Sequence, residues 1–103
     1  MKLTMICAVL ILTGAADARA QGGAKDLYLS KCATCHGADG EGKTAMGKKL
    51  KVQSAQAAVA KISAEQMIKV VTDGKGQDMS GYGKQFSAEQ IKGLVDYYRG
   101  LGK

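Results

Sequence analysis

Aromatic residues are scarce in this chain of 103 residues, which has no tryptophan, one phenylalanine and four tyrosines. Aromatic side chains bury the most apolar surface per residue, so a chain this poor in them builds only a small core unaided. A single domain of this size is marginally stabilised by its own core and usually needs a disulfide, a metal or another buried group. The composition therefore predicts one small domain that depends on an additional stabilising group.

Long apolar runs are absent as well. The run Met5–Leu12 falls well short of the roughly 20 apolar residues that a membrane span needs. Lys2 before it and the small-x-small pattern Ala18-Arg19-Ala20 after it are typical of a cleaved secretory signal. We predict that residues 1–20 are a signal peptide and that residues 21–103 form an exported, periplasmic domain with no stable membrane insertion. An uncleaved anchor is the alternative.

Cysteine and histidine are scarce as well, with three cysteines and one histidine in the chain. Removal of the signal takes Cys7 with it and leaves Cys32, Cys35 and the only histidine, His36. Structural zinc takes four protein ligands, so these three residues disfavour a structural zinc site. A redox-active dithiol of the thioredoxin type needs strands between its helices, and no strand pattern is present. The run Cys-Ala-Thr-Cys-His is instead typical of covalent haem attachment, with both thiols on one helical turn and the histidine as an axial ligand.

Hydrophobic periodicity predicts helices through most of the remaining chain. Apolar residues recur at helical spacing in residues 24–31, 55–62, 64–71 and 91–101. Ser-Ala-Glu-Gln opens the last two segments and is a capping-box pattern. A glycine-rich loop separates the cysteine motif from the second segment. We predict an all-α domain of three to four helices wrapped around one covalently attached haem c, which supplies much of the core.

A second axial ligand would have to be a methionine, because His36 is the only histidine. Met67 belongs to an apolar helix stripe, where methionine usually packs in the core. Met46 follows the glycine-rich loop, and we predict that it packs against a haem edge. Met79 lies in an irregular polar segment between two predicted helices, which lets its thioether approach the ring face opposite His36. We therefore predict that Met79 is the second ligand.

These features together resemble a small class I cytochrome c of the bacterial mono-haem type. The aromatic residue before Cys-x-x-Cys-His-Gly, the segment Gly-Lys-Gly followed by a methionine and a tyrosine, and the final helix all match that family. The resemblance implies that Cys32 and Cys35 carry the haem and that His36 and Met79 bind its iron. It also places Tyr82 in the haem pocket, and it implies a crossing of the first and last helices at Ala24, Tyr28 and Tyr97.

Three positions depart from the family pattern, and the chain has no proline at all. Ser80 replaces the proline that follows the ligand methionine, which predicts a less rigid loop and a labile iron–sulfur bond. Ala24 replaces the glycine of the helix crossing, which predicts a slightly wider contact. Lys48 takes the position of a second family proline, whose backbone carbonyl orients the proximal imidazole. A carbonyl survives this replacement, so an acceptor for that hydrogen bond is still available.

Two filled axial positions leave the iron no open site, which favours one-electron transfer over catalysis. The net charge of +6 and a lysine cluster predict docking to a donor and an acceptor redox protein with acidic surfaces. The chain has no aromatic stacking run for nucleic acid, and we expect a monomer. A haem subunit of a larger oxidoreductase, and a ligand-binding or weakly peroxidatic haem protein with a labile distal methionine, are the alternatives. The candidate docking residues are Lys43, Lys48, Lys49 and Lys51.

Overall fold

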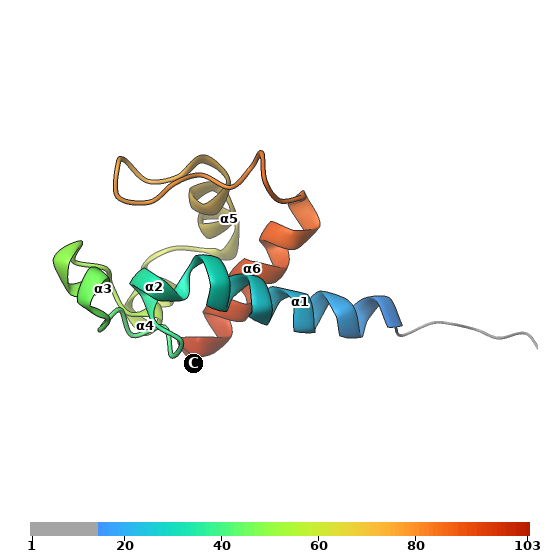
Figure 1. Ribbon diagram of the computed structural model, residues 1–103, viewed down its shortest axis with the longest axis horizontal. Helices are drawn as coiled ribbons and strands as arrows, with labels where there is room; N and C mark the ends of the chain where they lie inside the picture. The colour runs from blue at the N-terminus through green and yellow to red at the C-terminus, as the bar shows by residue number, and fades with distance from the viewer. Residues whose placement is uncertain (1–14) are drawn as a thin grey trace, which may run out of the picture.

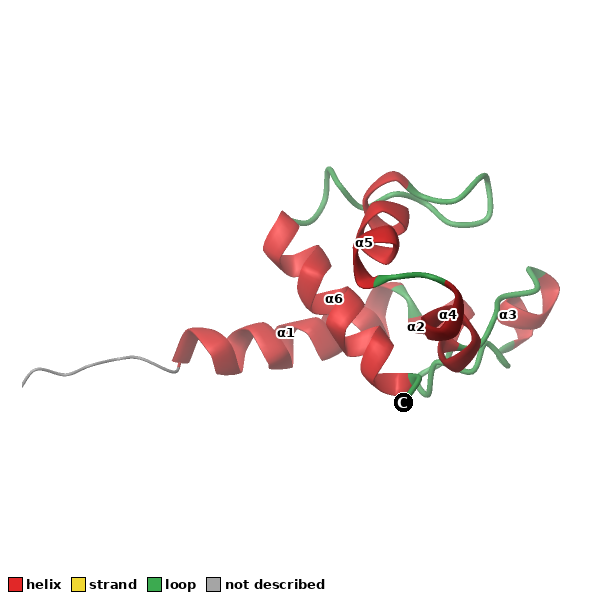
Figure 2. Ribbon diagram, turned by 180° about the vertical axis from the view of Figure 1, so that it is seen from behind, coloured by secondary structure: helices red, strands yellow, loops and turns green. Residues whose placement is uncertain are grey.

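The computed structural model describes residues 15–103, in which every regular element is a helix and no strand is present. The helices are α1 (Ala15–Lys31), α2 (Ala33–His36), α3 (Ala45–Lys49), α4 (Ala55–Lys61), α5 (Ala64–Asp73) and α6 (Ala88–Leu101) (Figures 1 and 2). The predicted all-α class is confirmed. The described residues hold six helices rather than three or four, because α2 and α3 are single turns without a periodic stripe of their own.

The predicted signal segment, residues 1–20, lies mostly outside the described residues. Helix α1 begins at Ala15 and runs through the predicted cleavage point to Lys31. Cleavage after Ala20 therefore stays a prediction.

Four helices begin after a hydroxyl side chain that accepts a hydrogen bond from a backbone N–H three residues further on. Such a bond satisfies one of the N–H groups that a helix start leaves without an intrahelical partner. In α5 and α6 the side chain of the glutamine three positions later accepts a hydrogen bond from the backbone N–H of the capping serine, so both predicted capping boxes are formed. The capping residues are Thr44, Ser54, Ser63 and Ser87.

The core lies where α1 crosses α6, and α4 and α5 also pack on α6 (Figures 1 and 2). Its apolar residues come from four helices and are 1–6% exposed. Met67 is among them, as its place in a helix stripe predicted. Arg99 adds a polar tie, because its guanidinium donates a 2.9 Å hydrogen bond to the Ile62 carbonyl between α4 and α5. The core residues are Ala24, Tyr28, Ala55, Met67, Ile91, Leu94 and Val95.

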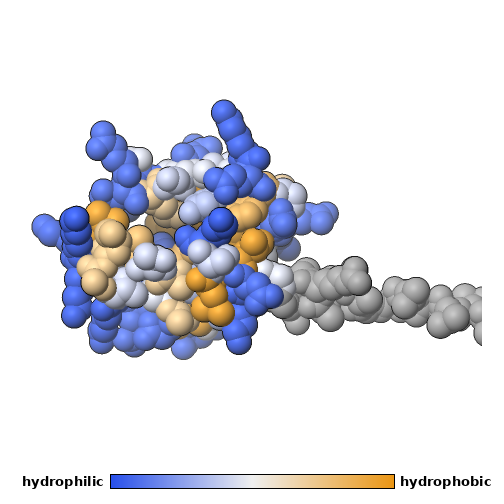
Figure 3. All heavy atoms as spheres, viewed as in Figure 1, coloured by the Kyte–Doolittle hydropathy of each residue, from blue (hydrophilic) through white to orange (hydrophobic). Residues whose placement is uncertain are grey.

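The segment between α5 and α6 carries the predicted iron ligand Met79 and crosses over the body of the domain as an irregular loop (Figure 1). In the space-filling view of the same side, hydrophobic and near-neutral residues gather in the middle of the face and hydrophilic residues surround them (Figure 3). The fold thus brings α2, α3 and this loop around one less polar area.

Candidate functional site

The three residues of the cysteine motif lie on one helical turn. Helix α1 ends at Lys31, Cys32 caps α2, and Cys35 and His36 complete the turn. The backbone N–H groups of Cys35 and His36 donate to the Cys32 carbonyl at 3.2 and 2.9 Å. Both thiols are free and half-buried. Two thiols and one imidazole are therefore presented together, as the spacing predicted.

Side chains from two other segments bind the carbonyl groups of this turn. The hydroxyl of Thr44 donates to the Thr34 carbonyl at 2.6 Å and lies 3.3 Å from the Cys35 carbonyl oxygen. The phenol of Tyr28 donates to the Gly37 carbonyl at 2.6 Å. A helix as short as α2 leaves its last carbonyls without intrahelical partners, and these hydroxyl groups supply them. Thr44 was not among the predicted site residues. Its hydrogen bonds depend on how α3 folds back on the motif, which the sequence pattern does not show.

The imidazole of His36 lies in an aromatic setting. The ring of Tyr98, from α6, meets it edge to face with the ring centroids 5.1 Å apart and an interplanar angle of 72°. Burial lowers the pKa of His36 below its usual value, which favours the neutral ring. Neutral imidazole is the form that binds a metal. Tyr98 also has no place among the predicted site residues, although its helix stripe was recognised.

One nitrogen of this ring, Nδ1, is buried and has no hydrogen-bond partner. The Lys48 carbonyl, which the replacement of the family proline leaves available, does not accept a bond from it. The Lys48 carbonyl accepts bonds from the backbone N–H groups of Leu50 and Lys51 instead. The local turn at the end of α3 thus uses the acceptor that the ring would need.

The acidity of the thiols bears on the dithiol interpretation. Burial, and to a lesser extent the neighbouring Cys35, raise the pKa of Cys32 to about 11. Redox-active Cys-x-x-Cys pairs have a lowered thiol pKa, which makes the thiolate available as a nucleophile. A protonated thiol at neutral pH is the opposite case. The setting therefore disfavours a dithiol oxidoreductase.

The loop that carries Met79 is fixed by backbone hydrogen bonds. Lys75 and Met79 form a two-bond antiparallel bridge, with N–H···O distances of 2.8 and 3.2 Å. After it, the N–H of Tyr82 donates to the Val71 carbonyl at 2.8 Å, which ties the loop to the end of α5. Backbone hydrogen bonds therefore lie on both sides of Ser80, which stands at the position of the family proline.

Tyr82 joins this loop to the cysteine motif. Its hydroxyl donates a 3.4 Å hydrogen bond to the Lys31 carbonyl, next to Cys32. Burial, and to a lesser extent Cys32 and Cys35, raise the pKa of Tyr82 above its usual value. Its ring also stacks on Phe86 at 5.4 Å. Met79, three residues earlier, is half-buried. The loop predicted to carry the second ligand therefore meets the motif.

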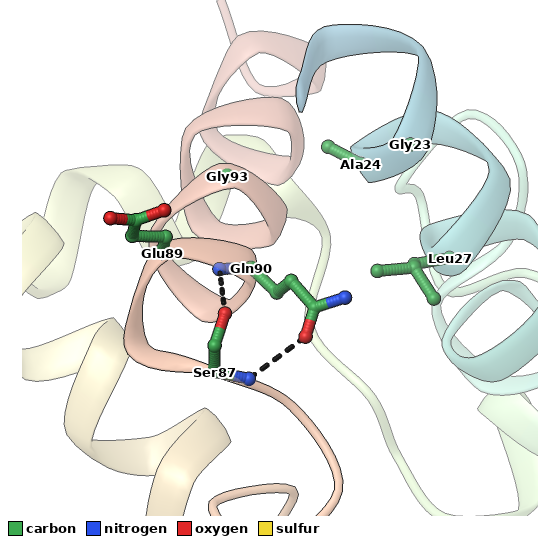
Figure 4. A pocket seen from close by; sticks show the side chains of 7 residues that line it. All are labelled: Gly23, Ala24, Leu27, Ser87, Glu89, Gln90 and Gly93. Carbon is green, nitrogen blue, oxygen red and sulfur yellow. Dashed lines mark hydrogen bonds between the residues drawn. The ribbon is translucent and has the colours of Figure 1, made fainter. Parts of the chain in front are cut away.

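The helix crossing is close-packed. The rings of Tyr28 and Tyr97 lie 5.2 Å apart, and Ala24 is 6% exposed. A β-carbon added to Gly93 of α6 would lie 3.5 Å from that of Ala24. Ala24, which replaces the family's glycine on α1, thus faces a glycine on α6. Beside this contact is a shallow hollow of about 180 Å³, which lies away from the cysteine motif (Figure 4).

The remaining candidate residues lie on and around α3. Met46 is 41% exposed, so its side chain is not enclosed by the protein. All four candidate docking lysines are exposed, and Lys43 pairs with Glu41 at 3.1 Å. The rest of the cluster, Lys48, Lys49 and Lys51, lies at the end of α3 and just after it.

The residues of the motif fit a covalently attached haem. Two free thiols stand three positions apart, and an imidazole whose pKa is lowered by burial follows them on the same turn, with Nδ1 buried. Residues 15–103 hold no cluster of three or more histidine, cysteine or carboxylate side chains that would bind a bare metal ion. None of their helices is long and apolar enough to span a membrane.

Comparison with known proteins gives a family and two similar solved structures. A family model described as cytochrome c oxidase, cbb3-type, subunit III, matches residues 19–97. The solved structure of KustC0563 c-type cytochrome is similar, with 33% sequence identity and a TM-score of 0.71 over 78% of this chain and 98% of that one. The structure of a point mutant of Kustc0563 is similar too, with 31% identity and a TM-score of 0.68 over 76% of this chain and 96% of that one. No curated protein matches.

Proposed function

Because the chain belongs to this family of cytochrome c domains, and is a small mono-haem c-type cytochrome with covalently attached haem c, we propose that it is a one-electron carrier with His36 and Met79 as iron ligands. Cys32 and Cys35 would hold the haem. When bound, the haem iron exchanges one electron between its ferrous and ferric states. The observation that carries the proposal is the hydrogen bond from Tyr82 to the Lys31 carbonyl, which brings the Met79 loop to the cysteine motif.

Each residue has a distinct task in this proposal. Burial favours the neutral form of His36, which keeps its lone pair available. Met79 offers a neutral thioether, and ligation by methionine and histidine raises the reduction potential. The backbone bridge between Lys75 and Met79 and the bond from Tyr82 to Val71 hold the thioether in place. This bracing favours a closed site over the ligand-binding or peroxidatic alternative.

The test is the ferric and ferrous absorption spectrum of the wild type beside Met79→Ala, with Met46→Ala as the matched control. We expect a sulfur-to-iron band in the red region for the ferric wild type and for Met46→Ala. Met79→Ala should lose this band and bind carbon monoxide readily in the ferrous state. A band that survives in Met79→Ala and disappears in Met46→Ala would assign the ligand to Met46 instead.

We propose that the lysine cluster around α3 steers an acidic redox protein to this side of the molecule. The support is its exposure and its concentration of charge within a few residues. Exposed charges are screened beyond about 8 Å at physiological ionic strength, so the rate of electron transfer should fall as salt is added. Lys48→Glu should slow the reaction more than Lys92→Glu, an exposed position on α6. Equal rates at all salt concentrations would contradict steering.

We also propose export to the periplasm, on the signal pattern of residues 1–20. Mass spectrometry of the protein from a periplasmic fraction should give a chain that begins at Gln21. A haem-loaded chain that still begins at Met1 would contradict cleavage.

A haem subunit of a larger oxidoreductase is the second candidate, because the matching family is described as an oxidase subunit. Gel filtration of the native protein distinguishes the two. A free carrier elutes alone, whereas a subunit elutes with a stoichiometric oxidase or dehydrogenase.

A further inference from the structure

The imidazole of His36 is oriented by something other than a hydrogen bond. A metal-bound histidine usually donates its second ring N–H to a carbonyl or carboxylate, which fixes the ring orientation. Here Nδ1 is buried without a partner, and the Lys48 carbonyl bonds to the backbone of its own turn. No hydrogen bond at Nδ1 therefore opposes rotation of the ring about its bond to the β-carbon.

The contact that does restrain the ring comes from α6. Tyr98 packs against His36 edge to face, at 5.1 Å and 72°. Edge-to-face aromatic pairs prefer a defined mutual angle, because the positive edge of one ring meets the negative face of the other. A rotation of the imidazole would lose this arrangement or drive it into the Tyr98 ring.

Tyr98 is itself held in place. Its ring lies 6.1 Å from that of Tyr28, and Tyr28 is 1% exposed, with its hydroxyl bonded to the Gly37 carbonyl beside His36. On α6, Tyr98 lies one helical turn after the buried residues Leu94 and Val95. The tyrosine is thus packed at the buried helix crossing, and its position depends on the same core.

We propose that Tyr98 is a positioning residue that fixes the plane of the His36 imidazole, in the role that a hydrogen bond to Nδ1 would otherwise have. The inference rests on the proposed ligation of iron by His36. It gives α6 a specific task, because this helix would set the orientation of the iron ligand His36, which lies on the short helix α2 after α1.

The test compares three variants of the haem-loaded protein. Tyr98→Leu removes the aromatic contact, Tyr98→Phe keeps it, and Tyr97→Leu perturbs the same helix crossing at a ring that packs on Tyr28. In the ferric protein, the hyperfine-shifted resonances of the haem methyl groups and the anisotropy of the electron paramagnetic resonance signal report the plane of the axial imidazole. We expect a changed methyl order and spread in Tyr98→Leu and the wild-type pattern in Tyr98→Phe. Tyr97→Leu should lower the melting temperature and keep the pattern.

Two results would overturn the proposal. One is a wild-type methyl pattern in Tyr98→Leu, and the other is an equal change in Tyr97→Leu, since that would trace the effect to general packing. If Tyr98→Leu does not fold, a nuclear Overhauser effect between the Tyr98 and His36 rings in the wild type decides, and its absence refutes the contact. A wild type without a low-spin, histidine-ligated iron contradicts the proposed function instead, so the two failures are distinguishable.

Discussion

Gly93 offers a sharp test of the helix crossing on which the site depends. It lies in the interior of α6, facing Ala24 of α1 beside the hollow in Figure 4. A β-carbon added there would meet only the β-carbon of Ala24, at 3.5 Å, which is an ordinary van der Waals separation. The crossing therefore has room for one methyl group. We predict that Gly93→Ala stabilises the protein.

The magnitude follows from two contributions. Glycine is about 0.8–1.0 kcal/mol less favourable than alanine in a helix interior. The added methyl group would also be partly buried, and a fully buried methylene contributes about 0.8 kcal/mol. We expect a gain of about 1 kcal/mol or slightly more. In a domain of this size, that gain raises the melting temperature by about 4–8 °C.

Two other glycines near the end of α6 provide matched controls, measured by guanidinium unfolding of the ferric protein. Gly100→Ala places its β-carbon in open space, so it should gain from helix propensity alone. Gly102→Ala would place a β-carbon 2.7 Å from the Ala55 backbone, and overpacking of this kind costs about 1–3 kcal/mol. If Gly93→Ala destabilises the protein while Gly100→Ala stabilises it, the helices cross more closely than described and the reasoning fails.

Three further predictions concern the motif turn. Burial raises the pKa of Tyr28 above its usual value near 10, so above that pH the folded chain keeps a proton that the unfolded chain loses. The contribution of this residue to stability should be constant below about pH 9 and fall above about pH 10. Melting temperatures measured against pH should therefore fall less steeply in Tyr28→Phe. Thr44→Val removes the N-cap hydrogen bond from Gly47 and the contact with the Cys35 carbonyl, and should lower the free energy of unfolding by about 1–2 kcal/mol in denaturant titrations. Thr44→Ser should keep most of the wild-type stability, and equal losses in the two variants would contradict the role of the hydroxyl. Gly47→Ala would overlap the Cys35 carbonyl oxygen, so the yield of haem-loaded protein should fall sharply, and an unchanged absorbance ratio of haem to protein would refute this.

Local chemistry explains what could be predicted from the sequence. The capping boxes that begin α5 and α6 depend on residues three apart, and the stripe through Ile91, Leu94 and Val95 depends on helical spacing, so both are visible in a short window. The same is true of the two thiols and the imidazole on one turn. These features specified the fold class and the candidate cofactor.

Contacts between distant segments explain what could not be predicted. The cap of α3, Thr44, bonds to carbonyls of the motif turn, and this depends on the path of the loop between them. Helical spacing places Tyr98 on the inner face of α6, but the angle of the helix crossing decides that it meets His36. The sequence shows that position 48 has a carbonyl, but only the structure shows that the turn at the end of α3 uses this carbonyl as its own acceptor.

The pairing of α1 with α6 also has a consequence for the order of events in synthesis. The inner face of α1, with Ala24 and Tyr28, is buried by the last helix of the described chain. A growing chain therefore cannot complete its core until α6 has been made, and contacts so distant in sequence form slowly. We therefore expect the nascent chain to stay open and unpacked until α6 has been made.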